Sequence, residues 1–232
     1  MLVHQAYRFE MDPNNATRSK IASHAGAARF AYNWGLDLVI NHLAARRALV
    51  VLAIRSDASR VEAEAWADDL LGRLPWTLPA LRRAWNQAKA EVAPWWAENS
   101  KESYNSGLDA LARALDAWSR SRRGARRGSK VGFPRFKAKS TARRSFKVTT
   151  GAFGVVDNRH IRLPRIGVIC TKEPTTKLEA AIGAGTVRIL SATVCRPRSP
   201  SMPAGGMWPL GSRSPGPSIG RRLAHPSVWT WA

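Results

Sequence analysis

The segment from Thr17 to Leu43, TRSKIASHAGAARFAYNWGLDLVINHL, decides most of the fold. Its apolar residues recur at steps of three and four, at positions 21, 25, 28, 32, 36, 39 and 43. That spacing puts them on one face of an α-helix, and Thr17 is of a type that caps helix N-termini. The apolar period runs through Gly26 without an offset. The segment therefore predicts one long amphipathic helix rather than two helices that meet at a turn.

Helical periodicity continues on the C-terminal side of this segment. In the last periodic stretch, Asn99 stands three residues before Glu102, as in a capping box. We expect the helices to pack as an antiparallel bundle that occupies residues 17–119. The further helical stretches are residues 57–71, a stretch that follows Thr77 and stops at Pro94, and residues 99–118.

A dense run of positive charge follows the helices. Residues 120–147 contain twelve Lys and Arg residues and no acidic residue, and their Gly and Pro residues prevent a continuous helix. Phe133, Phe136 and Phe146 are interleaved with the cations. Cations neutralise phosphates, and aromatic rings stack on unpaired bases or pin a loop to the fold. A solvated charged surface normally mixes both signs, so this basic loop favours nucleic-acid binding.

The charge of the whole chain agrees with that interpretation. Its 232 residues carry 37 Lys plus Arg against 16 Asp plus Glu, a formal net charge of +21. Such an excess favours a polyanionic partner, of which nucleic acid is the leading candidate and an anionic membrane the weaker one. No apolar run is long enough to span a bilayer, and the N-terminal residues lack the pattern of a signal peptide. We therefore expect a cytoplasmic protein without membrane contact.

Short alternating runs in residues 148–194 predict a small antiparallel sheet. Residues 1–16 contain one further run, around Tyr7 and Phe9, which ends at a turn signal. The fold class is thus α+β, with a helical region inserted between the first strand and the other strands. This order of elements is the basis for dividing the chain into a strand, a helical region, a basic loop and a sheet.

The remaining residues, 195–232, differ in composition from everything before them. They contain no Asp or Glu, show no periodicity and hold half of the 14 prolines. Such a segment is expected to be disordered. Its mixture of Arg, Pro, Gly, Ser, Ala and Trp is typical of GC-rich DNA translated out of frame. We therefore expect a frameshift near Val194.

A second group of candidate binding residues lies in the first predicted helix. Arg29 and Asn33 are four residues apart and share one strip of the helix surface, with Tyr32 beside them. Arg and Asn side chains read base edges or hold phosphates, whereas Tyr32 lies on the apolar face and is more often a core residue. The complete set of predicted nucleic-acid-binding residues is Arg29, Tyr32, Asn33, Arg122, Arg123, Arg126, Arg127, Lys130, Arg135, Phe136, Lys137, Lys139, Arg143, Arg144 and Lys147.

No catalytic or metal-binding group is evident in the sequence. Cys170 and Cys195 are too few for a zinc site, and no His stands at ligand spacing from them. Asp157 ends an apolar strand, as a metal ligand does in some nucleases, but Asp157-Asn158 also separates two alternating runs, as a hairpin turn does. A lone carboxylate does not build a metal pair, so the turn is the preferred interpretation.

Four segments stand in a recognisable order: RFAYNWGL (29–36), GFPRFKAK (132–139), SFK (145–147) and IRLPRIGVI (161–169). By this order and spacing the chain resembles the OrfB/TnpB proteins of insertion sequences, from its start to about residue 190. The resemblance implies an RNA-guided DNA nuclease architecture encoded in a transposon. It implies that the strands form a small barrel, the wedge domain, and that the helices form an inserted recognition lobe.

The same resemblance implies where the candidate residues lie and which partners they have. Arg29, Tyr32 and Asn33 would lie in the recognition lobe, and Pro134, Phe136 and Lys137 at its junction with the barrel. Guide-like RNA and DNA would be the partners.

The sequence also departs from the family. Family catalysis needs a RuvC-like domain whose carboxylates hold two divalent metals, and no acidic residue follows Glu179. The Cys-rich zinc ribbon is missing too. The resemblance therefore implies a truncated binding protein that needs no cofactor, with a divalent metal expected only for the missing domain.

Three alternatives to a truncated binding protein stay open. The chain is a fragment of an active RNA-guided DNA endonuclease whose other part lies in another reading frame, or it is a helix-turn-helix DNA-binding protein, or it is a remnant that folds poorly. The nucleotide sequence across Val194 distinguishes the first of these. Sequence-specific duplex binding by the N-terminal region distinguishes the second.

Overall fold

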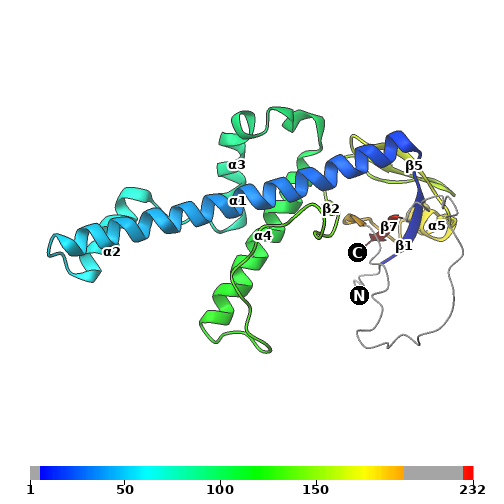
Figure 1. Cartoon of the computed structure of the whole chain (residues 1–232). Coiled ribbons are helices and arrows are strands. Elements are labelled where there is room, and N and C mark those ends of the chain that lie inside the picture. The colour runs from blue at the N-terminus through cyan, green and yellow to red at the C-terminus, as the bar shows by residue number, and fades with distance from the viewer. Residues whose placement is uncertain (1–5, 196–226, 232) are drawn as a thin grey trace, which may run out of the picture.

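The computed structural model describes residues 6–195 and 227–231. Within them the chain is α+β, with a helical region at one end and a sheet at the other (Figure 1). In chain order the elements are β1 (Arg8–Asp12), α1 (Asn15–Arg55), α2 (Arg60–Leu71), α3 (Leu78–Val92), the 3₁₀ helix η1 (Pro94–Glu98), α4 (Lys101–Arg122), β2 (Ser145–Val148), β3 (Gly154–Asp157), β4 (His160–Leu163), β5 (Gly167–Thr171), α5 (Thr176–Gly183), β6 (Ala192–Cys195) and β7 (Ser227–Trp231).

Helix α1 is the longest element and links the two ends of the molecule. It runs for 41 residues and passes through Gly26 without a break, which confirms one continuous helix (Figure 1). Its N-cap is Asn14 rather than Thr17, because the Asn14 side chain accepts a hydrogen bond from the Thr17 backbone N–H at 2.8 Å. No helix within the described residues combines the length and the apolar character needed to cross a bilayer.

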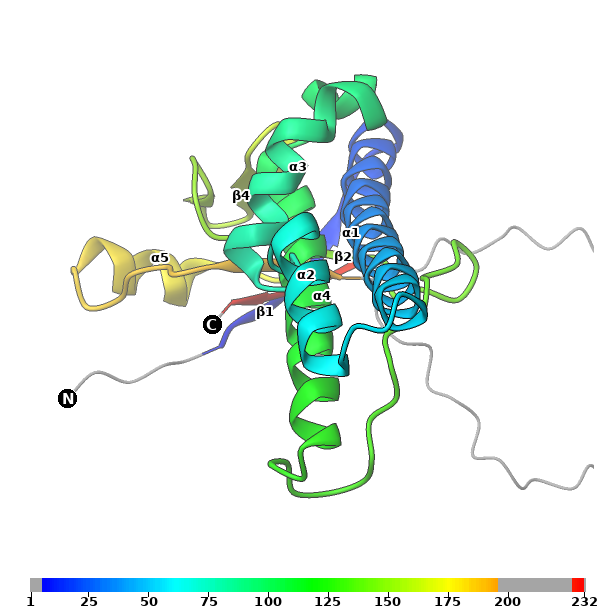
Figure 2. The same ribbon diagram turned by 90° about the vertical axis from the view of Figure 1, so that its left-hand side faces the viewer.

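The helices do not form the simple antiparallel bundle predicted from the sequence. Helix α2 turns back along the C-terminal half of α1, where the Arg46 guanidinium pairs with the Asp68 carboxylate at 2.6 Å. Helices α3 and α4 instead cross α1 (Figures 1 and 2). A β-carbon on Gly107 of α4 would lie 2.0 Å from the carbonyl oxygen of Ala28, so the two helices touch backbone to backbone. This close approach sets the crossing of α1 and α4.

A core of aliphatic and aromatic side chains fills the crossing of the helices. Leu36, Leu81, Leu108 and Leu111 are fully buried there. Helix α4 is capped by Ser100 rather than by Asn99, since the Ser100 side chain accepts from the N–H of Glu102. Asn99 is itself buried, and its side chain accepts a hydrogen bond from Ser23 of α1 at 3.0 Å. The predicted capping position therefore serves as a contact between helices.

The seven strands of the described residues form one antiparallel sheet in the order β2-β6-β7-β1-β5-β4-β3. A barrel would require the edge strands β2 and β3 to pair, and within the described residues they do not. Side chains of α4 occupy the free edge of β2. Ser106 Oγ accepts from the N–H of Lys147 at 3.0 Å, and the Glu102 carboxylate accepts from the N–H of Thr149 at 2.9 Å. The predicted small barrel is therefore wrong, and the sheet is open.

The predicted disordered tail also needs correction in one part. Most of it, residues 196–226 and 232, lies outside the described residues. Residues 227–231, however, form β7, which pairs with β6 on one side and with β1 on the other. The sequence SVWTW mixes β-branched and aromatic residues, which are strand formers. The low complexity of the surrounding segment hides this short signal.

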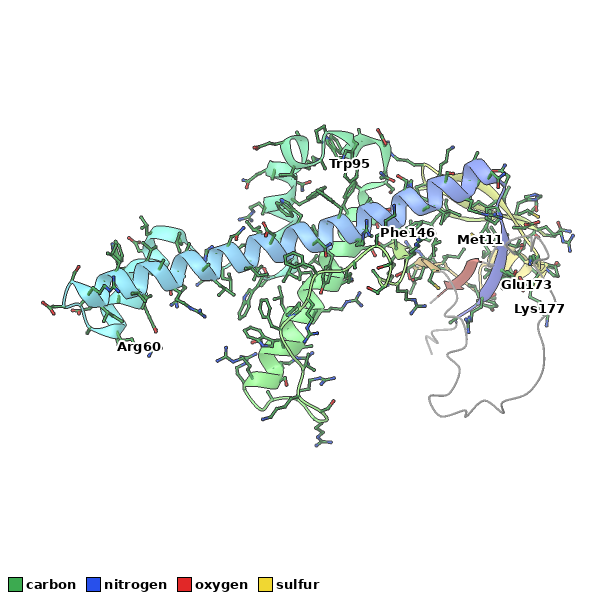
Figure 3. The ribbon with its side chains drawn as sticks, in the orientation of Figure 1. Met11, Arg60, Trp95, Phe146, Glu173 and Lys177 are labelled. Carbon is green, nitrogen blue, oxygen red and sulfur yellow. The ribbon has the colours of Figure 1, made fainter. Side chains whose placement is uncertain are left out.

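The N-terminal half of α1 covers the sheet and so joins the two cores. Ala25 and Ala28 pack with a sheet core that contains Met11 and Phe146. In Figure 3, Phe146 lies beside α1 and Met11 lies on the first strand. One turn further along α1, Ala31 belongs to the helical core instead. Helix α1 thus packs against both the sheet core and the helical core, and these two contacts fix its position. The basic loop runs back along this helix.

Candidate nucleic-acid interface

The basic loop (residues 120–147) begins at the end of α4 and returns to the sheet. Its first three residues belong to α4, and its last three belong to β2. Between them the chain leaves the tip of α4 and rises toward α1 and β2 (Figure 1). Both ends of the loop are therefore anchored in regular structure.

The tip of the loop presents its cations to solvent. The exposed residues there are Arg122, Arg123, Arg126, Arg127 and Lys130. The Arg122 guanidinium lies 5.3 Å from the centroid of the Trp118 ring, and Arg126 donates to the carbonyl of Ser129 at 3.0 Å. Neither contact involves an acidic group, so neither neutralises the charge. Phosphates would meet these cations without displacing a carboxylate.

The return limb, which we define as residues 131–144, runs antiparallel to α1. At its start Phe133 packs edge-on against Trp118, with ring centroids 4.9 Å apart. Near its middle Lys137 contacts Tyr32 and Asn33 of α1. Just beyond its end the Phe146 ring lies 5.5 Å from the ring of His24. Later residues of the limb thus meet earlier residues of α1.

A pair of hydrogen bonds fastens the limb to α1. The Asn33 Oδ1 atom accepts from the N–H of Lys137 at 2.8 Å, and Asn33 Nδ2 donates to the carbonyl of Lys137 at 3.1 Å. The amide therefore pairs with the limb as a neighbouring strand would. Both ends of the Asn33 side chain are occupied, which gives this predicted binding residue a positioning role.

The Lys137 side chain is held over an aromatic ring. Its ammonium nitrogen lies 3.6 Å from the centroid of the Tyr32 ring, within the range of a cation–π contact. Burial lowers the pKa of Lys137, and the charge of Arg113 lowers it further. Tyr32 is only 5% exposed, and burial raises the pKa of its phenol. Tyr32 is thus a core residue, as its place on the apolar face indicates. Its ring contacts the Lys137 ammonium.

Only one of the three aromatic residues of the loop is free to stack. Phe146 is 2% exposed in the sheet core, and Phe133 is packed against Trp118. Phe136, in contrast, is 55% exposed and sits between Arg135, which is also exposed, and Lys137. Sequence spacing alone does not separate these three rings. The structure leaves Phe136 as the aromatic side chain with an open face beside two cations.

The remaining predicted residues separate into two groups. The Lys147 backbone is bound to α4, and its side chain is exposed on β2. Four other cations, Arg29, Lys139, Arg143 and Arg144, gather beside the N-terminal half of α1. Asn33 therefore binds the middle of the return limb, whereas Arg29 lies with the cations at its end, although both residues share one strip of α1.

Asp157 does not offer a metal site. Its Oδ1 accepts from the N–H of Arg159 at 2.8 Å and lies 2.8 Å from Nδ1 of His160. These two contacts, the first more than the second, lower the pKa of the carboxyl group. The arrangement is that of the β3–β4 turn and confirms the preferred interpretation. Within the described part of the chain, no three His, Cys, Asp or Glu side chains are grouped to hold an ion.

Two features of the interface were missed from the sequence. Glu102 on α4 accepts from both the N–H and the hydroxyl of Thr149, and so fixes the chain just after β2. A patch of small residues on α1, Ala22, Ala25 and Gly26, faces the end of the limb. The signal for the second feature is present in the sequence, because these residues precede Arg29 by seven, four and three positions and share its face.

Comparisons with known proteins give two similarities. Residues 1–47 match a family model described as a helix-turn-helix domain, of the OrfB type found in IS605 elements. Two proteins from two strains of Mycobacterium tuberculosis, each named "Putative RNA-guided DNA endonuclease", are 36% identical to the chain over 200 residues. The match covers 83% of this chain but only 39% of either relative. The chain therefore spans about two fifths of the length of these relatives.

Proposed function

The chain is an OrfB/TnpB-type protein of insertion sequences, and from this premise we propose that it is a transposon-encoded protein that binds guide-like RNA or DNA through its basic loop. The binding surface comprises the tip of the loop, the return limb and the adjoining strip of α1. Binding itself needs no nuclease domain and no metal ion. The two mycobacterial relatives carry the name of an RNA-guided DNA endonuclease, which is consistent with a nucleic-acid partner.

One observation carries this proposal: a segment with twelve cations and no acidic residue is anchored in α4 and β2 at its ends and is hydrogen-bonded to α1 at Lys137. A basic segment with no contacts to the rest of the fold would bind polyanions weakly and without selectivity. A basic segment whose backbone is held against the fold can present its cations along one phosphate backbone. Each phosphate neutralised releases condensed counterions, which makes the affinity strongly dependent on salt.

The exposed ring of Phe136 favours an unpaired strand over a plain duplex. Bases in a duplex are stacked on each other and do not offer a face to a side chain. In a single-stranded loop or bulge a base can stack on an aromatic ring, while the flanking cations hold its phosphates. Arg135, which precedes Phe136 and is exposed, is suited to that task, whereas the Lys137 ammonium lies over the Tyr32 ring.

The test is equilibrium binding to a structured RNA from the same locus, with single-stranded DNA and duplex DNA for comparison. All measurements contain EDTA. We expect affinity for the RNA to fall by about 10³ or more between 50 and 200 mM salt if six or more phosphates are contacted. The neutral variant Arg82→Gln, in an exposed position on α3, is the control and should bind as the wild type does. Affinity that is insensitive to salt would contradict the proposal.

A second candidate function follows from the length of the match. Since the chain covers 39% of either relative, its residues are compatible with one part of a complete endonuclease whose other part is encoded in a different frame. Translation of the downstream frames should then reveal a strand followed by an Asp, and later segments that carry Glu and Asp. A genuine stop codon with no such continuation in any frame would reject this candidate.

A third candidate is sequence-specific binding of duplex DNA, which the description of the matching family model favours. A helix-turn-helix places its second helix in the major groove after a sharp turn, whereas residues 15–55 form one helix. We therefore rank it below the basic loop. A duplex that contains the ends of the insertion sequence, measured against a scrambled duplex, tests it directly. Equal affinity for the two duplexes would reject it.

A further inference from the structure

Beside the N-terminal half of α1 the structure contains a small basic cavity, which we call the α1 pocket. Its volume is about 100 Å³. Four cations line it: Arg29 from α1, and Lys139, Arg143 and Arg144 from the end of the return limb. We propose that the α1 pocket holds one phosphate of the polynucleotide backbone, as a specific site within the proposed binding surface. This inference rests on the proposed function and makes it more specific.

The fold brings the four cations together from two segments. A hydrogen bond from the N–H of Ala142 to the carbonyl of Ala138, at 2.9 Å, curls the limb into a single helical turn. Lys139 lies within this turn and Arg143 directly after it, and both residues line the pocket. The two hydrogen bonds between Asn33 and Lys137, which we call the Asn33–Lys137 clamp, hold the chain just before this turn against α1. The end of the limb and Arg29 therefore line the same cavity.

The charges in the pocket have no counterion among the described residues. None of the four side chains forms a hydrogen bond or an ion pair with another residue that the structure describes. By contrast, other arginines are paired with carboxylates, as Arg46 is with Asp68 and Arg113 is with Asp109. Lys139, Arg143 and Arg144 are exposed to solvent and Arg29 is partly buried. An anion near their charged ends would relieve the repulsion among the four side chains.

The other wall of the pocket explains which part of a nucleotide fits. It is formed by small residues of α1, namely Ala22, Ala25 and Gly26, together with Ala142. No aromatic ring of the described residues lines the cavity, so it offers no stacking surface for a base. Its volume of about 100 Å³ is large enough for one tetrahedral oxyanion. Phosphate recognition therefore fits the pocket better than base recognition.

Gly26 provides the sharpest test, because it lines the pocket and carries no side chain. A β-carbon at this position would have no atom within 4 Å, so a side chain there extends into open space. Leu is also a better helix former than Gly. The Gly26→Leu variant should therefore fill the pocket while it keeps every charge and the helix. A diffuse field of positive charge predicts no effect of this substitution, whereas a phosphate site predicts weaker binding.

The experiment measures binding of a single-stranded RNA oligonucleotide at several salt concentrations. For Gly26→Leu we expect affinity to fall roughly tenfold, as when one charge-assisted hydrogen bond is removed. The slope of log affinity against log salt should become shallower by about 0.7, as when a single strand has one fewer phosphate neutralised. Arg29→Gln should give the same two changes. Gly183→Leu on α5, where a β-carbon also meets nothing within 4 Å, is the matched control and should bind as the wild type does.

Three results would overturn or separate these proposals. Wild-type affinity and slope for Gly26→Leu, in a variant whose urea unfolding shows an intact fold, would overturn the phosphate site but leave the basic loop as the binding surface. Failure of the wild-type protein to bind the oligonucleotide in a salt-dependent manner would overturn the proposed function itself. Inorganic phosphate that binds the wild type and not Gly26→Leu, with unchanged oligonucleotide affinity, would assign the pocket to a free anion and overturn the inference.

Discussion

The side-chain amide of Asn33 pairs with both backbone polar groups of Lys137, accepting from the N–H at 2.8 Å and donating to the carbonyl at 3.1 Å. The two residues are 104 positions apart in the chain. This one pair of hydrogen bonds fixes the register between the return limb and α1. It also sets the Lys137 ammonium over the Tyr32 ring. The geometry of the proposed interface depends on it.

Replacing Asn33 with Ala should release the limb. Two partly buried hydrogen bonds are removed, which should lower the free energy of unfolding by about 1–3 kcal/mol. Trypsin should also cleave the limb faster after Arg135 and Lys137. Urea unfolding and limited proteolysis measure the two effects. In the control Asn41→Ala, the bond that is removed is an exposed one to Asp37 on the same helix, and both properties should stay near the wild type. Equal proteolysis rates in the two variants would contradict the clamp.

Truncation of Phe136 should weaken RNA binding, whereas truncation of Phe133 should lower the stability of the fold. Phe136→Ala removes an exposed ring, so stability should change by less than about 0.5 kcal/mol. Its affinity for single-stranded RNA should weaken by about 1–3 kcal/mol for each base that stacks on the ring. Phe133→Ala instead removes the packing against Trp118 and should lower the stability. Unfolding curves and binding isotherms of both variants decide this. Unchanged RNA affinity in Phe136→Ala would exclude stacking at this position.

Substitution of three helical glycines by Ala should change the free energy of unfolding by amounts that depend on the space around each glycine. Gly107→Ala places a methyl group 2.0 Å from the backbone oxygen of Ala28, which cannot move aside like a side chain, so we expect a loss of roughly 3 kcal/mol or more. Gly35→Ala meets a flexible Leu111 methyl at 2.8 Å and should cost less. Gly26→Ala meets nothing and should stabilise the helix by about 0.5–1 kcal/mol. Urea unfolding gives the order, and a tolerated Gly107→Ala would contradict the helix crossing.

Stability should depend on pH through His24. The ring is buried, its Nδ1 lies 2.8 Å from the carbonyl of Lys20, and its Nε2 accepts from the N–H of Ser100 at 3.2 Å. Burial lowers the pKa of His24 below 6.5; the hydrogen bond to the Lys20 carbonyl opposes this shift, and the charges of Arg165 and Lys20 add to it. The unfolded chain then takes up a proton near pH 6.5 that the folded chain takes up only at lower pH. The contribution of His24 is therefore complete above pH 6.5 and declines as the pH falls through the folded pKa.

Unfolding measured at pH 7.5 and at pH 5.5 tests this dependence. The wild-type protein should lose more stability between the two conditions than His24→Gln does. His42→Gln, further along α1, should behave like the wild type. A pH dependence in His24→Gln equal to that of the wild type would contradict the assignment.

Local patterns predicted much of the fold. The steps of three and four from Ile21 to Leu43 correctly indicated one helix through Gly26, since periodicity depends only on neighbours in the sequence. The turn at Asp157 was identified for the same reason. The crossing of α1 and α4 was not predicted, because it depends on the contact of Gly107 with Ala28, far apart in the chain.

The candidate site shows the same division between local and distant information. The excess of cations was plain from composition, and the exposure of the loop tip agrees with it. Which aromatic ring is free was not predictable, because the ring of Phe133 is covered by Trp118, 15 positions earlier in the chain, and Phe136 has no such ring contact among the described residues. The barrel was wrong because the edge of β2 is bonded to Ser106 and Glu102 of α4, which no pattern within the strands reveals.

The most direct test of the proposed interface is the salt dependence of RNA binding, in EDTA, when the loop tip is neutralised. The test variant changes to Gln four exposed arginines of the tip: Arg122, Arg123, Arg126 and Arg127. The control changes to Gln four exposed arginines elsewhere in the helical region: Arg55, Arg73, Arg82 and Arg83. Both variants have the same net charge. The proposed interface predicts that only the test variant binds more weakly, with a slope shallower by about 0.7 for each phosphate that the tip no longer neutralises. Equal slopes and equal affinities in the two variants would contradict it.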